Sequence, residues 1–292
     1  MEDVWLLLAL VATLLYGISQ VAQKMAMKEI PSSTVVSLSI VVATPIAVIC
    51  LVPYLVTGDI LDVEPMTMVL ALASATFGQI GYYLYLEAAG RGPISIVGSV
   101  TASYPIMVIV VAVLFLSETP SYLQLGGVLL VTTAMIVLSY SHGKEAQTNS
   151  YFGKYLPLCL VTVLLYGLWA IFTKLALDEM PPLLFIGVYA FVIPPTVLWY
   201  YHYKGIKLRQ ALPSWSVPFT IAVIASEVSN IAFFFEINAA DQGPASIVFP
   251  VVAASPVVVV LMAYGFLKER LSRNEILLVV AVIAGIVMAS TV

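Results

Sequence analysis

One ionisable side chain lies in the middle of a long apolar stretch of this sequence. Glu227 belongs to the stretch 215–238, and Asn230, Phe234 and Asn238 follow it at intervals that place all four on one face of a helix. A carboxyl in apolar surroundings favours its neutral form, so it can exchange a proton or hold a polar solute. We therefore predict that this face binds substrate and that Glu227 couples transport to protons; binding without coupling is equally allowed.

A matching polar and aromatic stripe occurs 151 residues earlier in the chain. Thr76, Gln79, Tyr83 and Glu87 repeat the same spacing, so they also share one face of a helix. Such side chains either hydrogen-bond neighbouring helices or line a cavity between them. We predict that both stripes face one cavity and that Gln79 and Tyr83 bind substrate there.

Two further apolar stretches carry candidate substrate contacts. Gln20 lies in the first stretch of the chain, and Trp169 lies in the corresponding stretch of the second half. An amide can hydrogen-bond a solute, and an indole can present its flat face to a ring or a cation. Lys24 and Lys174 lie near the ends of these stretches, where a lysine can contact substrate or the free carbonyls of a helix C-terminus.

Prolines interrupt two other apolar stretches at matching positions. Pro105 and Pro256 each remove a backbone hydrogen bond to the carbonyl four residues back. We therefore predict a pair of helix kinks, which suit helices that rock or gate around a central site. Tyr104 and Phe249 lie in the same stretches, where packing and cavity contact are equally plausible roles.

The composition decides which class of protein must position these residues. Of 292 residues, 61% are hydrophobic and 10% are charged, against about 45–50% and about 25% in soluble domains. This balance excludes a soluble enzyme and a disordered chain, and the net charge of -4 gives no reason to expect a nucleic-acid partner. Two cysteines and two histidines cannot build a zinc cluster, and no phosphate-binding loop occurs, so we predict no metal and no cofactor.

Ten stretches are long and apolar enough to cross a bilayer as helices. The predicted fold is therefore an all-α integral membrane protein with ten transmembrane helices, approximately at residues 4–27, 33–57, 66–88, 94–117, 121–140, 154–177, 183–203, 215–238, 244–267 and 273–291.

The second half of the chain repeats the first. Residues 14–31 recur 150 positions later with eight identities in 18, and residues 92–139 recur at offset 151 with 17 identities in 48. We predict one repeat at 1–140, a polar linker at 141–153 and a second repeat at 154–292. Because each repeat holds five spans, an odd number, the two must enter the membrane from opposite sides, which predicts an inverted repeat with a site between the halves.

Lysines and arginines are distributed unequally between the two sides that these ten spans define. Eleven of the twelve fall on one side, and Lys174 alone falls on the other. Because basic residues favour the cytoplasmic side, both termini are predicted to lie outside the cytoplasm. We predict a multi-pass protein of the cell membrane.

Short motifs occur in the same order in each half. They are Tyr16-Gly17 with Lys24 and Tyr166-Gly167 with Lys174, Gly92-Pro93 and Gly243-Pro244, Pro105 and Pro256, and Leu116-Ser117-Glu118 and Leu267-Lys268-Glu269. On these motifs the chain resembles, over nearly its whole length, the EamA family of the drug/metabolite transporter superfamily. The resemblance implies ten helices as two five-helix inverted repeats around a central cavity, moving amino acids, other small metabolites or drugs. Members of this family often keep their termini in the cytoplasm, so the charge distribution leaves the direction of transport open.

The predicted function is secondary transport of a small organic metabolite by alternating access. A lipid or lipid-linked headgroup flippase or scramblase is the alternative within transport. An intramembrane enzyme is disfavoured because neither histidine lies in the interior of a span to act as a base, and no filter motif suggests a channel. The expected partners are a small-molecule substrate, the lipid bilayer and a proton as candidate coupling ion, for a monomer or homodimer. If Glu227 does not couple transport, Glu87 and Glu236 are the remaining candidate acids.

Overall fold

The computed structural model describes residues 4–92, 94–116, 118–146, 152–206, 215–267 and 273–289. Within these residues the regular elements are all helical. They are α1 (Val4–Ala26), α2 (Ser32–Thr57), the short 3₁₀ helix η1 (Asp59–Asp62), α3 (Pro65–Arg91), α4 (Ile94–Thr101), α5 (Pro105–Phe115), α6 (Tyr122–Ala146), α7 (Phe152–Leu177), α8 (Pro182–Lys204), α9 (Val217–Gln242), α10 (Ala245–Ala253), α11 (Ser255–Leu267) and α12 (Arg273–Ala289).

Most of these helices are long and apolar enough to cross a membrane. Seven described segments meet that standard, and three shorter apolar helices accompany them, at Pro105–Leu114, Tyr122–Ala134 and Ile276–Ala289. The expected all-α, multi-pass membrane architecture is thus confirmed.

Helix α6 extends beyond the predicted membrane span. It continues to Ala146, so residues 141–146 of the predicted linker are helical, and residues 147–151 lie outside the described part of the chain. A run of polar residues can end a membrane span without ending a helix, and the linker at 141–153 stays a prediction. Pro93, Lys207, Arg209, Lys268, Glu269 and Arg270, which carried parts of the sequence argument, also lie outside the described residues.

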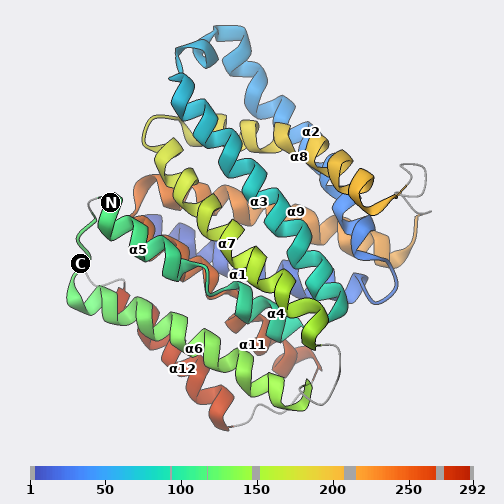
Figure 1. The fold of residues 1–292 in the computed structure, drawn as a ribbon, viewed down its shortest axis with the longest axis vertical. Coiled ribbons are helices and arrows are strands. Elements are labelled where there is room, and N and C mark those ends of the chain that lie inside the picture. The colour runs from blue at the N-terminus through green and yellow to red at the C-terminus, as the bar shows by residue number, and fades with distance from the viewer. Residues whose placement is uncertain are drawn as a thin grey trace.

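Equivalent helices of the two halves pack against one another. In Figure 1, α6 and α12 lie together at one end of the molecule, and α2 and α8 lie together at the other. Between them, α3 packs mainly against α7, and α1 packs mainly against α9. Each half therefore contributes to every major interface, and neither half forms a core by itself.

Helices α3 and α7 run antiparallel. Thr67, near the start of α3, donates to Glu179, just past the end of α7, at 2.7 Å. Further along α3, Ser74 contacts Thr173 at 2.7 Å, and Thr162, near the start of α7, donates to the Gly81 carbonyl at 3.5 Å. Residue numbers in these contacts rise along α3 and fall along α7, as two repeats of opposite orientation require.

Two of the predicted spans are broken in their middle. Between α4 and α5 the chain forms a turn at residues 102–104, and Pro105 starts α5. Between α10 and α11 the break is at Ala254, and Pro256 lies in the first turn of α11. The sequence predicted kinks, and the structure shows full interruptions, because each proline removes a helical hydrogen bond next to residues that can turn.

Two lysines hold the ends of helices within their own halves. The Lys24 Nζ donates to the carbonyls of Ala89 and Gly92 at 2.5 and 3.0 Å, at the end of α3. The Lys174 Nζ donates to Ala240 and Gly243 at 3.0 and 3.4 Å, at the end of α9. Of the two roles considered for these lysines, the structure shows contact with helix C-terminal carbonyls, which a cation stabilises.

Glu118 supplies the opposite kind of cap. Its Oε1 accepts from the Ala245 backbone N–H at 2.8 Å, and its Oε2 accepts from the Ser246 backbone N–H at 3.0 Å and the Ser246 hydroxyl at 2.5 Å. The Leu-x-Glu motif of the first half thus binds the first turn of α10 in the second half, where free N–H groups favour an anion.

Helices α6 and α12 approach each other through glycines. A Cβ added to Gly127 would lie 2.5 Å from both the Ala289 nitrogen and the Gly285 oxygen. A Cβ on Gly285 would lie 2.7 Å from the Gly127 oxygen. Small residues at these points allow backbone contact between helices, which drives helix association in lipid.

We predict that Gly127→Ala separates α6 from α12 and lowers the thermal stability of the purified protein. The collision is with backbone that cannot move aside, and overpacking of this kind costs about 1–3 kcal/mol. The matched control is Gly126→Ala, whose Cβ would meet only the flexible end of Met288, at 3.6 Å. Thermal unfolding in detergent checks both variants, and equal melting temperatures would contradict the proposed backbone contact.

Candidate functional site

A central cavity lies where the two halves meet. The volume of this cavity is about 190 Å³. Its walls come from α1, α2, α3, α7, α8 and α9, together with the broken segments around residues 101–104 and 252–255. The helix breaks therefore lie beside the cavity, where backbone freed from helical bonds can face polar space instead of lipid.

Aromatic rings form much of the cavity wall. The ring centroids of Tyr104, Tyr166 and Trp169 lie 5.8 to 6.2 Å apart in edge-to-face pairs. On a second wall, Tyr189 and Phe233 approach to 4.5 Å. Rings from α7, α8, α9 and the first helix break thus surround a common space, and they present both faces and edges to it.

One acid faces this space. Glu236 of α9 is 2% exposed, and its Oε2 accepts a hydrogen bond from the Tyr16 hydroxyl of α1 at 2.7 Å. Among the described lining residues no lysine, arginine or histidine accompanies it. A carboxyl enclosed in this way can hold either a proton or a cation, because an uncompensated buried charge is costly.

Several lining polar atoms have no partner within the protein. Gln20 donates through Nε2 to the Ser255 hydroxyl at 3.1 Å, but its Oε1 is buried and unpaired. The Gln79 Oε1 and the Trp169 Nε1 are buried and unpaired as well. The Tyr85 hydroxyl, which also lines the cavity, is unpaired too. Buried polar groups are nearly always hydrogen-bonded, so four orphaned atoms around one cavity point to a solute or water that completes them.

The structure brings four of the seven predicted substrate residues to this cavity. They are Gln20, Gln79, Trp169 and Asn230. Tyr83 does not line it: the side chain is 1% exposed and its hydroxyl bonds Thr196 at 3.0 Å, one layer behind the wall. On α3 the lining residues are Gly78, Gln79, Tyr82 and Tyr85.

The predicted cavity positions of Glu227 and Phe234 are wrong. Both side chains are exposed on the outside of α9, Phe234 at 41%, and neither lines the cavity. Glu227 and Glu236 are nine positions apart, and at about 100° per residue they lie on opposite faces of the helix. The face that lines the cavity carries Ser226, Ser229, Asn230, Phe233 and Glu236.

A signal for the correct face was present in the sequence. Ser226, Ser229, Phe233 and Glu236 follow one another at three- and four-residue intervals. The predicted face, which starts from Glu227 as the most central acid, is displaced by about one position from the face that lines the cavity. Lipid and protein interior are both apolar, so hydrophobic periodicity does not identify the inner face of a transmembrane helix.

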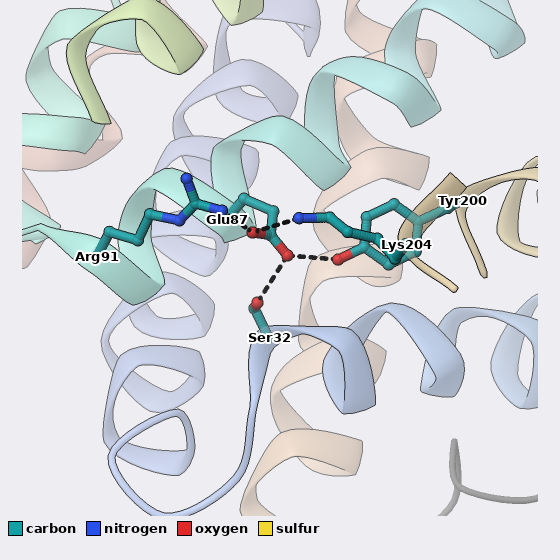
Figure 2. A network of polar contacts seen from close by, with 5 residues as sticks. All are labelled: Ser32, Glu87, Arg91, Tyr200 and Lys204. Atoms are coloured by element: carbon teal, nitrogen blue, oxygen red, sulfur yellow. Dashed lines mark hydrogen bonds and ion pairs between the residues drawn. The ribbon is translucent and has the colours of Figure 1, made fainter. Parts of the chain in front are cut away.

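A polar cluster lies near one end of the bundle, at the C-terminal ends of α3 and α8 (Figure 2). Glu87 accepts a hydrogen bond from Ser32 at 3.2 Å and another from the Tyr200 hydroxyl, and it pairs with Lys204 at 2.9 Å and Arg91 at 2.7 Å. The cluster joins α2 and α3 of the first half to α8 of the second half. Glu87 is therefore committed to ion pairs and lies away from the cavity wall.

Comparison with protein families agrees with this architecture. The model of the EamA-like transporter family matches the chain twice, at residues 3–140 and 153–291. The chain belongs to the EamA-like transporter family. It is a multi-pass membrane transporter of the drug/metabolite type, as the paired motifs predicted.

Two individual proteins resemble this EamA-like transporter. An uncharacterized protein of Methanocaldococcus jannaschii is 26% identical over 140 residues, which make up 48% of this chain and 99% of that protein. A protein of known crystal structure aligns over 99% of this chain and 98% of its own, with a TM-score of 0.74 and 14% identity. The first match has the length of one repeat, and the second shows that the fold of nearly the whole chain also occurs in a solved structure.

The assignment of faces on α9 can be tested by cysteine labelling. In a Cys50→Ala, Cys159→Ala background, Asn230→Cys is expected to react with a charged methanethiosulfonate roughly tenfold or more faster than Phe234→Cys. A thiol reacts as the thiolate, which forms in polar surroundings and not in lipid. Mass spectrometry of the labelled protein in liposomes gives the two rates. Equal rates, or faster labelling at residue 234, would refute the assignment.

Proposed function

We propose that this EamA-like transporter moves a small organic solute across the membrane by alternating access through the central cavity. The observation that carries the proposal is a cavity between the two halves, with one buried acid and four unpaired polar atoms. A site at the interface of two opposed halves can be exposed to either side by rocking one half against the other.

The helix pairing supports an inverted ten-span repeat. The equivalent helices α2 and α8 pack antiparallel, with Ser37 beside Tyr201 and Leu51 beside Gly187. The equivalent helices α6 and α12 do the same, because Gly127 lies beside Ala289 while Val131, further along α6, lies beside Gly285. The breaks in α4–α5 and α10–α11 supply matching points at which each half can bend.

The two ends of the molecule differ in charge. The Glu87 cluster ties α3 to α8 at one end, and at the position equivalent to Glu87 in the second half stands Asn238, which bonds its own helix at the Phe234 carbonyl. In this proposal the ion pair of Glu87 with Lys204 and the Glu87–Tyr200 hydrogen bond hold one end closed and must separate when that end opens. Each state then differs by a small number of breakable contacts.

We further propose that Glu236, in place of Glu227, carries the proton when transport is proton-coupled. It is the acid in contact with the cavity, and the Tyr16 hydroxyl stabilises its charged form. Proton and solute would then compete for one carboxylate, which couples their movements without a second site.

Glu236→Gln is expected to abolish solute-driven proton movement while leaving the protein folded. An amide keeps the shape and the hydrogen bond to Tyr16 but cannot exchange a proton. The measurement uses proteoliposomes with an internal pH-sensitive dye and a panel of small organic solutes. Glu227→Gln, the same substitution on the outer face of α9, is the control and is expected to keep the wild-type rate. Unchanged proton movement in Glu236→Gln would exclude Glu236 as the coupling group.

We propose that the protein lies in the cell membrane with both termini outside the cytoplasm, on the eleven-to-one distribution of basic residues. A C-terminal fusion to a fluorescent reporter that matures only in the cytoplasm should therefore stay dark. The same fusion to an enzyme that folds only outside the cytoplasm should be active. A bright reporter on intact protein would reverse the orientation.

A further inference from the structure

The charges around the central cavity are unbalanced. Glu236 is the one acid among its described lining residues, and no basic side chain lines it. The nearest candidates are all engaged elsewhere: Lys24 and Lys174 bind helix-end carbonyls, and Lys204 and Arg91 pair with Glu87. A solute that enters the cavity therefore meets a negative or neutral site, which favours a cation and opposes an anion.

The aromatic wall favours the same charge. Tyr104, Tyr166 and Trp169 form an edge-to-face group with centroids 5.8 to 6.2 Å apart, and Trp169 also packs edge-to-face on Phe249 at 5.5 Å. A cation is attracted to an aromatic face within about 6 Å of its centre, most strongly by indole, and the attraction grows when water is excluded. The wall thus offers the faces and the low polarity that hold an organic cation.

The unpaired polar atoms add hydrogen-bond specificity. The free oxygens of Gln20 and Gln79 are acceptors, which an ammonium N–H can satisfy and a carboxylate cannot. The free Trp169 N–H is a donor, which suits a neutral oxygen such as a hydroxyl on the body of the solute. The unpaired Tyr85 hydroxyl can donate or accept, so the open groups together suit a solute with an ammonium and a neutral oxygen.

We infer that the central cavity takes organic amines in their cationic form, with Glu236 as the counter-charge and the aromatic wall around the ammonium or the body of the solute. This inference rests on the proposed transport function and names its substrate class. The matching groups are an ammonium for Glu236 and the two amide oxygens, an aromatic or apolar body for the rings, and a neutral oxygen for Trp169.

The same geometry gives a pH dependence. Besides Glu236, the titratable lining residues are Tyr16 from α1, Tyr82 and Tyr85 from α3, Tyr104 from the first helix break, Tyr166 from α7 and Tyr189 from α8, while α2 and α10 contribute none. Phenols carry no charge at neutral pH, so Glu236 alone changes charge with the proton concentration. Protonation removes the counter-charge, and binding of a cation must weaken as pH falls.

Three solutes with the same body and different charge test this inference. Tyramine is a cation, tyrosine a zwitterion, and 3-(4-hydroxyphenyl)propionate an anion at neutral pH. Isothermal titration calorimetry on the purified protein in nanodiscs should show tyramine binding about tenfold or more tighter than either of the others, the equivalent of one well-placed charged contact. The Kd for tyramine should rise as the pH is lowered from 8 to 6, a range in which the amine stays protonated.

Two variants separate charge from folding. Glu236→Gln should bring tyramine to the affinity of tyrosine and remove the pH dependence. Trp169→Leu should weaken tyramine about tenfold while the pH dependence remains, which also shows that the variant is folded. Glu227→Gln is expected to match the wild type in both respects.

The opposite results would overturn the inference. Tyrosine or the propionate binding as tightly as tyramine, or a pH dependence that persists in Glu236→Gln, would exclude a cation site at Glu236. If the liposome assay finds solutes that move while tyramine neither binds nor moves, the substrate class is wrong and the transport function stands. If no small organic solute in the panel moves at all, the transport proposal fails first.

Discussion

The structure depends on how helix ends are stabilised inside a bilayer. Water is not available there to hydrogen-bond free carbonyls or N–H groups, so each helix that ends at membrane depth needs a partner from the protein. Lys24 and Lys174 supply that partner at the ends of α3 and α9, and Glu118 supplies it at the start of α10. The capped groups lie where α3 and α9 end and α10 begins, at the junctions between consecutive helices and away from the cavity wall.

The cavity lies beside the two helix breaks between α4 and α5 and between α10 and α11. Continuous helices would fill the space between the halves with side chains, as α6 and α12 do where glycines bring their backbones together. At the breaks around residues 101–104 and 252–255 the chain turns beside Gln20, Tyr104 and Trp169 instead. Packing is therefore tight at the ends of the molecule and open at its centre, which is the distribution that a movable pair of halves needs.

The two halves share the positions that shape the helices, and they differ in the acids that bear on function. The lysine caps and the helix breaks occur in both halves at equivalent positions. The acids do not: Glu236 faces the cavity from the second half, and the Glu87 cluster closes on α8 at one end only. In the proposed mechanism the two related halves provide two exchangeable states. Acids that occur in only one half make those states differ and select the solute.

The sequence alone determined the architecture and the repeated motifs, because both are local properties of the chain. Apolar length indicates which segments can span the membrane, and Pro105 and Pro256 mark the positions of two helix breaks. Pro45, Pro157 and Pro194 lie inside continuous helices, so proline alone does not decide where a helix breaks. The recurring Gly, Pro and Glu positions identified the duplication and, through it, the family.

Only the tertiary structure decided which side of each helix faces inward. Helix α9 carries one acid on each of two opposite faces, Glu227 and Glu236, so the presence of an acid does not identify the inner face. Glu227 is the more central acid in the sequence, yet it faces outward, while Glu236 meets Tyr16 from a helix 220 residues away. The orientation of α9 follows from its packing against α1, and this long-range contact decided between the two faces that the sequence offered.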